Sequence, residues 1–278
     1  MIATPPAPTP SSSGPLLDVR DIGIAFGGLK AVQHFSLSLP KGGLFGLIGP
    51  NGAGKTTVFN LLTGVYEAQS GSIMLDGVPL MGLAPDAIAC RGLSRTFQNI
   101  RLFGQLSVLD NIRLACHCRG KHSLVGTALR SPRFIGQERA MRERAESLLS
   151  IFGLQDRMHE PARSLPYGDQ RRIEILRAMA TEPKVLLLDE PAAGMNPHET
   201  KSLAESIRRI RSEFGLTILL IEHDMGLVMD ICERITVLDH GCIISEGVPS
   251  HVQNDPKVVE AYLGVPTPPA ADTPAEKH

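Results

Sequence analysis

The chain has no tryptophan, only five cysteines and almost no excess of charge. Its 28 Lys and Arg residues are balanced by 29 Asp and Glu residues, and a net charge of -1 argues against a nucleic-acid-binding protein. No apolar run approaches the roughly 20 residues that span a bilayer, and the N-terminus lacks the basic and apolar regions of a signal peptide. We therefore expect a cytoplasmic chain that meets a membrane only through partners.

The cysteines are too few and too scattered for a disulfide framework. They are Cys90, Cys116, Cys118, Cys232 and Cys242, an odd set that is typical of reduced thiols in the cytosol. The run Cys116-His117-Cys118 with His122 lacks a second pair at zinc-finger spacing. We interpret it as a helix end with incidental thiols.

Composition divides the chain into two tails and one domain. Residues 1–15 and 266–278 are rich in Pro and Ala and read as flexible tails, which leaves a domain at 16–265. Short apolar runs at 37–39, 44–48, 185–189, 217–221 and 234–238 predict strands. Their alternation with helices predicts an α/β fold with a largely parallel sheet. Helical signals dominate from Val108 to about Thr181, including the amphipathic stretch Arg139–Phe152, and predict a helical subdomain at about 101–181.

A glycine-rich turn follows the expected strand at 44–48 and opens a helix over Lys55–Thr63. Its residues are Gly49, Pro50, Asn51, Gly52, Ala53, Gly54, Lys55, Thr56 and Thr57, which fit the phosphate-binding pattern G-x-x-x-x-G-K-[ST]. The glycines let backbone N–H groups point at an anion, and the helix N-terminus adds positive potential. The pattern predicts that Lys55 binds the β- and γ-phosphates of ATP and that Thr56 offers a hydroxyl to Mg²⁺.

Two carboxylates, Asp189 and Glu190, stand at the end of the apolar run that begins at Val185. The carboxyl ends of strands are where open α/β sheets bind ligands. Because successive side chains alternate in direction along a strand, the two carboxylates should diverge. We expect Asp189 to belong to the Mg²⁺ shell and Glu190 to act as a general base toward water.

A third motif precedes a helical stretch that runs to about Thr181. It consists of Leu165, Pro166, Tyr167, Gly168, Asp169, Gln170, Arg171 and Arg172. It resembles the signature motif of ABC ATPases, commonly written LSGGQ, and the resemblance extends over roughly residues 16–265. It implies a P-loop NTPase with a RecA-like core, an antiparallel β portion near the N-terminus and a helical subdomain. It also implies that two cassettes pair head to tail, with each ATP between one phosphate loop and the opposing signature residues 165–169.

The same resemblance assigns roles to four further positions. Gln98 matches the glutamine of the Q-loop, which in the family serves both catalysis and the Mg²⁺ site. His223, after the expected strand at 217–221, matches the catalytic switch histidine. Phe26 matches the aromatic residue that stacks on adenine, and residues 193–196 match the D-loop.

The chain departs from the family pattern in two places. In the signature, Pro166 replaces serine, Tyr167 replaces the first glycine, and Asp169 replaces glutamine. These changes remove the serine hydroxyl, but proline and an acidic residue suit the first turn of a helix. In the D-loop, Asn196 replaces the Asp of many relatives and cannot act as a carboxylate.

Four stretches, 95–103, 106–112, 165–172 and 189–197, resemble the ATPases of branched-chain amino acid importers. The resemblance favours the larger of their two ATPase subunits, the LivG-like one, which has an extended segment here at about 116–136. It implies a second ATPase subunit, as a homodimer or a LivF-like heterodimer, two transmembrane permeases and, indirectly, a periplasmic substrate-binding protein. The chain would then lie peripherally on the cytoplasmic face of the inner membrane.

Two alternatives remain open from the sequence. Another cargo, such as urea, amides or aromatic acids, is compatible because the cargo is bound by other subunits. A soluble ABC ATPase outside transport is the second, although the chain has neither a sustained heptad run nor a second phosphate loop. Within a transporter, the apolar residues Ile100, Leu102 and Phe103 predict a permease contact in a cleft between core and helical subdomain.

Overall fold

The computed structural model describes residues 14–119 and 132–263. The two tails predicted at 1–15 and 266–278 lie almost entirely outside these residues, as does His122. Within them, no helix combines the length and apolar character needed to cross a bilayer.

A six-stranded sheet forms the centre of the molecule. Its spatial order is β10-β9-β3-β8-β7-β6, and every neighbouring pair is parallel except the edge pair β9 and β10. The strands are β3 (Leu44–Ile48), β6 (Leu93–Arg95), β7 (Val185–Asp189), β8 (Thr217–Ile221), β9 (Arg234–Asp239) and β10 (Cys242–Gly247). All residues of β3, β7 and β8 are buried, which explains their continuous aliphatic sequence.

Alternate residues of these strands contribute to two different hydrophobic cores. On β7, Leu186 and Leu188 belong to the core shared with the helices α3, α5, α6 and α7, while Val185 and Leu187 belong to the core shared with α1 and the second sheet. This follows from the period of two along a strand. The central sheet is therefore covered on both faces, as a parallel sheet requires.

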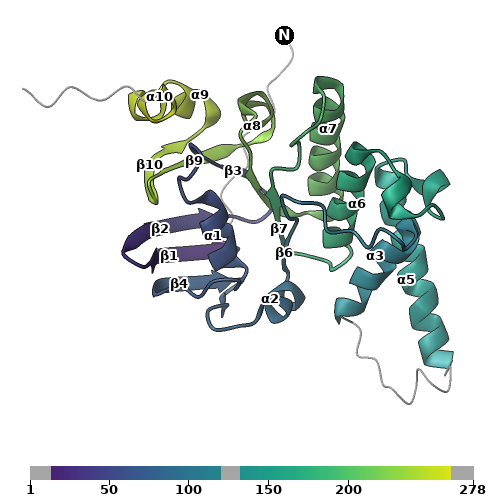
Figure 1. Ribbon diagram of the computed structural model, residues 1–278. Coiled ribbons are helices and arrows are strands. Elements are labelled where there is room, and N and C mark those ends of the chain that lie inside the picture. The colour runs from purple at the N-terminus through teal and green to yellow at the C-terminus, as the bar shows by residue number, and fades with distance from the viewer. Residues whose placement is uncertain (1–13, 120–131, 264–278) are drawn as a thin grey trace, which may run out of the picture.

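The second sheet is antiparallel, with the order β2-β1-β4-β5. Its strands are β1 (Leu17–Phe26), β2 (Leu29–Leu39), β4 (Ser70–Leu75) and β5 (Val78–Pro79). Figure 1 shows it at one end of the molecule, beside α1 (Lys55–Leu62), with α2 (Pro85–Arg91) below.

Between β6 and β7 the described elements are all helical, and Figure 1 shows them at the opposite end from the antiparallel sheet. They are α3 (Val108–Cys116), η1 (His117–Arg119), α5 (Pro132–Ile151), η2 (Gln155–Arg157), η3 (Ala162–Ser164) and α6 (Tyr167–Met179). The helix α3 begins where the Ser107 side chain accepts a hydrogen bond from Asp110 N at 3.0 Å. The cysteines Cys116 and Cys118 lie at the end of α3 and in η1.

The remaining helices follow the last strands. They are α7 (Pro197–Phe214), α8 (Met225–Ile231), α9 (Pro249–Gln253) and α10 (Pro256–Leu263). Asn196 caps α7, since its side chain accepts from Glu199 N while Glu199 accepts from Asn196 N. The predicted architecture, an α/β core with an N-terminal antiparallel portion and a helical subdomain, is confirmed.

Candidate nucleotide-binding site

The candidate site lies at the edge of the central sheet where its parallel strands end. The loops that follow β3, β6, β7 and β8 all emerge there, because parallel strands have their carboxyl ends on the same side. These loops carry Gly49–Gly54, Gln98, Glu190 and His223. The fold therefore brings together motifs that are far apart in the sequence.

The glycine-rich loop is held tightly against its neighbours. Gly49 has φ 149°, and a Cβ atom there would lie 2.0 Å from the carbonyl oxygen of Leu238, so no side chain fits. Gly54 precedes α1 in a left-handed conformation, with φ 104°. The N–H groups of the first turn of α1 are therefore available at the end of a rigid loop, which suits a phosphate group.

Lys55 lies inside this loop and is only 8% exposed. Its Nζ donates hydrogen bonds to the carbonyl oxygens of Gly49 at 2.7 Å and Pro50 at 2.9 Å. Burial lowers the pKa of Lys55, and the charges of Glu190 and Asp189 oppose that shift.

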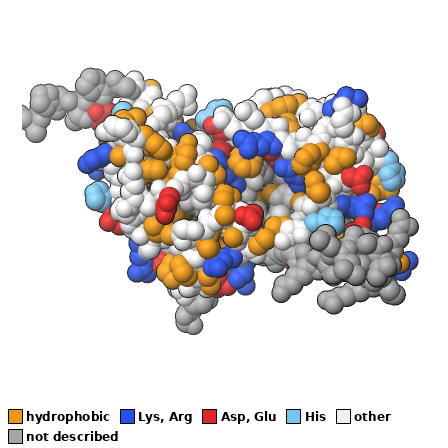
Figure 2. Space-filling view, turned by 60° about the horizontal axis from the view of Figure 1, so that its bottom comes forward, with side chains coloured by type: hydrophobic (Ala, Val, Ile, Leu, Met, Phe, Trp, Pro, Cys, Tyr) orange, Lys and Arg blue, Asp and Glu red, His pale blue; other side chains and the backbone are white. Residues whose placement is uncertain are grey.

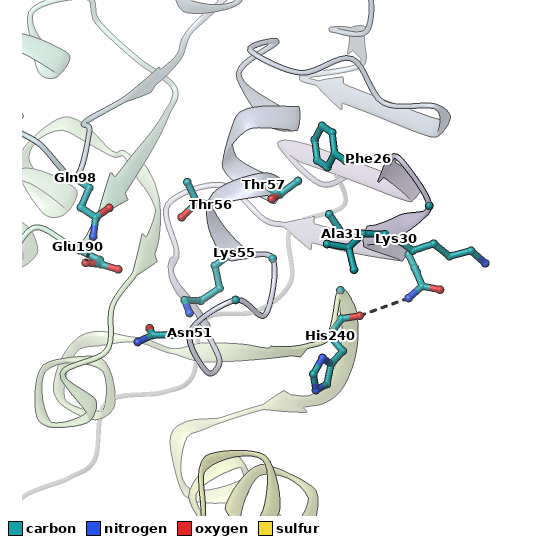
Figure 3. A pocket seen from close by; sticks show the side chains of 16 residues that line it. Phe26, Lys30, Ala31, Asn51, Lys55, Thr56, Thr57, Gln98, Glu190 and His240 are labelled. Carbon is teal, nitrogen blue, oxygen red and sulfur yellow. Dashed lines mark hydrogen bonds between the residues drawn. The ribbon is translucent and has the colours of Figure 1, made fainter. Parts of the chain in front are cut away.

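A cavity of about 800 Å³ extends from this loop to the antiparallel sheet. Figure 3 shows Phe26 at one side of it, the loop with Lys55, Thr56 and Thr57 in the middle, and Gln98 with Glu190 at the other side. The cavity is lined by Phe26, Gly28, Leu29, Lys30, Ala31, Gln33, Asn51, Gly52, Gly54, Lys55, Thr56, Thr57, Gln98, Glu190, His240 and Gly241.

Phe26 forms part of the cavity wall on the side of the antiparallel sheet. Its ring is 44% exposed and meets Tyr66 edge to face, with 5.2 Å between the ring centroids. Sequence reasoning missed Lys30, Gln33 and His240, which line the same part of the cavity. An aromatic ring at one side and a phosphate-binding loop beside it together fit a nucleotide.

Glu190 is the centre of a small polar cluster. Its Oε2 accepts a hydrogen bond from Gln98 Nε2 at 2.8 Å, and His223 Nδ1 lies 3.8 Å from the same oxygen. The Glu190 backbone has φ 48°, which is strained for a residue with a side chain. Gln98 and His223, predicted from two other motifs, thus lie beside the carboxylate of Glu190.

The neighbouring Asp189 points elsewhere, as the alternation along β7 predicts. Its Oδ2 accepts from Arg95 Nη2 at 2.6 Å, and Arg95 also donates to Asn60 Oδ1 at 2.7 Å. Arg95 lies in the stretch 95–103, but the sequence gives no sign of this role. Thr56 and Gln98 line the cavity, whereas Asp189 is buried and does not. The hydroxyl, amide and carboxylate of the three residues are donor types that suit Mg²⁺.

Glu222 is a further residue that sequence reasoning missed. It is 1% exposed, and its carboxylate accepts from Ala192 N at 2.7 Å and from His223 N at 3.1 Å. Burial raises its pKa, and these backbone hydrogen bonds lower it. Glu222 therefore ties the turn after Glu190 to the turn that carries His223.

Comparisons with known proteins decide the family. The model of the ABC transporter family matches residues 32–193, and a model described as branched-chain amino acid ATP-binding cassette transporter matches residues 242–266. The chain belongs to the ABC transporter ATP-binding family. It is a nucleotide-binding protein and an ATP hydrolase of the ABC class.

Relatives in this family are similar over nearly their whole length. The chain is 47% identical to the high-affinity branched-chain amino acid transport ATP-binding protein LivG of Escherichia coli (strain K12), over 91% of this chain and 99% of LivG. It is 44% identical to the corresponding protein BraF of Pseudomonas aeruginosa, with the same coverage. The ADP conformation of MJ1267, an ATP-binding cassette of an ABC transporter, superimposes with a TM-score of 0.79 at 31% identity, over 90% of this chain and 99% of that one.

The signature residues of this ABC cassette lie away from its own nucleotide cavity. None of Leu165, Pro166, Tyr167, Gly168 and Asp169 lines that cavity. Pro166 occupies the N-cap of α6, one position before the helix begins, and its missing N–H costs nothing there. Asp169 is paired with Arg157 at 3.3 Å and Arg172 at 3.2 Å.

Tyr167, which replaces a glycine of the family pattern, has a definite contact. A Cβ atom at Gly194 of the D-loop would lie 3.3 Å from Tyr167 Cε1, so the ring lies directly against that glycine. The Tyr167 hydroxyl also lies 3.3 Å from Arg171 Nη2. The side chain therefore connects the start of α6 with the segment that follows Glu190.

Arg171 continues this connection to the Q-loop. It is fully buried, and its guanidinium donates to the carbonyl oxygens of Phe97 at 2.7 Å and Gln98 at 2.6 Å. Glu174, 3% exposed, accepts from the same guanidinium at 3.0 Å. The position of Gln98 in the nucleotide cavity is thus tied to the helix that begins with the signature.

A second cavity, of about 300 Å³, lies between the core and the helical subdomain. Its walls include Ala89 of α2, Ala115 of α3 and Arg177 of α6, and Phe97 also lines it. We call it the interdomain cleft; Figure 2 turns the α2 side of the molecule toward the viewer and shows a hollow between its two parts.

The three apolar residues predicted to form a partner surface, Ile100, Leu102 and Phe103, do not form one exposed patch. Phe103 is 51% exposed, whereas Leu102 packs against the hydrophobic core and Ile100 is half-buried. None of the three lines the interdomain cleft, to which this stretch contributes Phe97.

Proposed function

We propose that this ABC ATPase powers the import of branched-chain amino acids. The observation that carries the cargo is the 47% identity to LivG of Escherichia coli over nearly the whole of both chains. The match of residues 242–266 to the branched-chain amino acid family model supports it from an independent part of the chain.

In this proposal ATP binds across the 800 Å³ cavity. Phe26 stacks on adenine, and residues 49–57 enclose the phosphates with their backbone N–H groups. Lys55 exchanges its hydrogen bonds to the loop carbonyls for bonds to the β- and γ-phosphate oxygens. Mg²⁺, held by Thr56, Gln98 and Asp189, would neutralise charge on the phosphate oxygens.

Glu190 is the proposed general base. Its carboxylate faces the cavity and is oriented by the Gln98 amide at 2.8 Å, so it can accept a proton from a water molecule aligned with the γ-phosphate. His223 has a 62% exposed side chain whose Nδ1 lies 3.8 Å from Glu190, and from there it can reach the γ-phosphate. In this arrangement the proton acceptor, Glu190, is distinct from Lys55 and the loop N–H groups, which stabilise negative charge on the phosphate oxygens.

A second cassette is the proposed partner at the nucleotide. The signature residues are remote from the chain's own cavity, and Pro166 and Tyr167 are exposed, which supports a head-to-tail pair. In such a pair the start of α6 of one subunit meets the ATP of the other. The partner is either a second copy of this chain or a LivF-like subunit.

Two transmembrane permeases are the proposed partners at the interdomain cleft. The cleft is bounded by elements of both parts of the cassette, and Phe97 beside Gln98 connects it directly to the Q-loop. The chain would then be peripheral to the cytoplasmic face of the membrane. A periplasmic substrate-binding protein would deliver the amino acid and contact only the permeases.

Uptake in cells tests the cargo. A strain without the chromosomal gene is complemented with the wild type, with Glu190→Gln or with Glu205→Gln, and uptake of labelled leucine, phenylalanine and urea is measured. We expect leucine uptake with the wild type and with Glu205→Gln, whose exposed carboxylate lies on α7, and none with Glu190→Gln.

Either of two outcomes would overturn the proposal in favour of another function. Uptake of urea or phenylalanine in place of leucine would assign another cargo to the same motor. Unchanged uptake of all three solutes on loss of the gene, together with purification of the chain without membrane subunits, would favour an ABC ATPase outside transport.

A further inference from the structure

Two cysteines from different parts of the cassette meet next to residues that line the interdomain cleft. Cys90 is on α2 of the core, and Cys118 is in η1, after α3 of the helical subdomain. Their sulfur atoms lie 2.9 Å apart without a disulfide between them, and Cys90 Sγ also lies 3.1 Å from the carbonyl oxygen of Cys118. A disulfide requires about 2.05 Å between the sulfurs, so an approach of about 0.9 Å would suffice.

The other cysteines have different surroundings. Cys116 donates to the Ile112 carbonyl oxygen of its own helix, and burial raises its pKa. Cys232 is 6% exposed, and burial raises its pKa to about 12, so it forms little reactive thiolate. Cys242 is exposed but lies on β10, the edge strand of the central sheet farthest from β6. Among the described cysteines, only Cys90 and Cys118 are paired for oxidation.

We propose that Cys90 and Cys118 form a reversible disulfide under oxidising conditions and thereby clamp the interdomain cleft. The cleft walls include Ala89 and Ala115, one residue before Cys90 and three residues before Cys118. The bond would therefore join α2 to η1 directly beside the cleft. α2 and η1 already pack against each other, so the bond needs no rearrangement of the fold.

The chemistry needs a two-electron oxidant, and hydrogen peroxide is the one proposed. The exposed thiolate of Cys90 attacks one peroxide oxygen, the O–O bond breaks, and a sulfenic acid and a hydroxide form. The thiolate of Cys118 then attacks the Cys90 sulfur, the S–S bond forms, and the S–O bond breaks. The two hydroxides leave as water with the two thiol protons, so two thiols and one peroxide give one disulfide and two water molecules.

The clamp would act on the coupling between ATPase and permease, a consequence that rests on the proposed function. A permease seated in the cleft transmits the state of the nucleotide through movements of α2 relative to α3 and α6. A covalent bond between α2 and η1, which directly follows α3, restrains the distance between two of these walls. Oxidation would then stop transport reversibly without touching Lys55, Glu190 or His223.

The first test is chemical and needs no transporter. The purified full-length chain is treated with hydrogen peroxide, blocked with N-ethylmaleimide and digested with trypsin. We expect a dithiothreitol-sensitive link between peptides 56–91 and 114–119, the first of which contains Cys90 as its only cysteine. Because the second peptide contains both Cys116 and Cys118, the link must survive Cys116→Ser and disappear in Cys118→Ser and Cys90→Ser.

The second test uses the assembled transporter in proteoliposomes. We expect peroxide to abolish most leucine transport by the wild type and by Cys242→Ser, dithiothreitol to restore it, and Cys118→Ser to be resistant. A link through Cys116, dimers joined by Cys90, or Cys90 oxidised only to sulfinic acid would overturn the disulfide. A Cys90–Cys118 bond that leaves transport unchanged would overturn the clamp, whereas a reduced transporter that moves no leucine would count against the proposed cargo.

Discussion

Arg95 Nη2 lies 2.6 Å from Asp189 Oδ2, and the two side chains are only 5% and 3% exposed. The guanidinium also packs over the rings of Phe59 and Phe97, with 5.3 and 5.2 Å to their centroids. One side chain therefore joins the end of β6, the end of β7 and the helix that follows the phosphate loop. A charge pair this deeply buried contributes little by itself, but loss of one partner leaves the other uncompensated.

We predict that Arg95→Met lowers the free energy of unfolding by about 3–5 kcal/mol, because Asp189 would remain buried without its counter-ion. The measurement is urea unfolding followed by circular dichroism. Arg20→Met is the matched control, since the Arg20 side chain is 74% exposed in its pair with Asp18 and its loss should leave the midpoint unchanged. Equal midpoints for Arg95→Met and the wild type would mean that Asp189 is solvated in another way.

The phosphate loop and the pair Asp189 and Glu190 could be singled out from the sequence because each is local: a short motif next to an apolar strand. His223 is singled out only by the resemblance to the ABC family. Arg95 and Glu222 could not be assigned roles in this way. The partner of Arg95 is 94 residues away, and only the register of β6 against β7 brings the two together. Glu222 is an acidic residue that follows an apolar strand. The sequence around it does not indicate which backbone N–H groups will donate hydrogen bonds to its carboxylate.

The antiparallel sheet was harder to predict than the central one for a physical reason. β1 pairs with β4 across about 50 residues, with Leu17 opposite Leu75, and its ladders are interrupted after Val19 and after Arg20. Asp21 has φ 52° at this irregularity. The irregularity breaks the alternation of buried and exposed side chains by which a half-buried strand is recognised. The antiparallel sheet could therefore be expected only from the resemblance to the ABC family.

Glu190→Gln is predicted to retain ATP binding and to lose about 10²–10⁴-fold in turnover, because an amide cannot accept the proton from water. Gln98 can keep its hydrogen bond to the remaining carbonyl oxygen, so the local geometry should survive. Phosphate release and binding of a fluorescent ATP analogue are measured on the same preparation. A variant with more than half of the wild-type turnover would remove Glu190 from the role of general base.

Lys55→Ala should impair ATP binding, the step that precedes hydrolysis. Loss of charge-assisted hydrogen bonds worth about 1.5–3 kcal/mol is expected to weaken ATP binding by at least about tenfold. Lys201→Ala, on the exposed face of α7, is the matched control for the loss of one positive charge. If both variants bind the nucleotide analogue as the wild type does in a titration, the loop does not hold the phosphates through Lys55.

Tyr167 provides the sharpest test of the signature, because it departs from the family pattern and has a defined contact. Its side chain is 47% exposed, so we expect Tyr167→Ala to change the free energy of unfolding by no more than about 1 kcal/mol. Turnover should nevertheless fall by roughly tenfold or more, because the ring that lies on Gly194 also packs against the Arg171 guanidinium, 5.8 Å from the ring centroid, and Arg171 holds the Q-loop carbonyls.

Tyr167→Phe separates the ring from the hydroxyl. It keeps the contact with Gly194 and loses only the 3.3 Å contact with Arg171, so it should retain most of the turnover. The measurement is ATPase activity of the assembled transporter at saturating ATP, with thermal unfolding of each isolated variant beside it. Full activity in Tyr167→Ala would show that the start of α6 communicates with Glu190 without this side chain. An equal loss in both variants would assign the effect to the hydroxyl, and therefore to the position of Arg171.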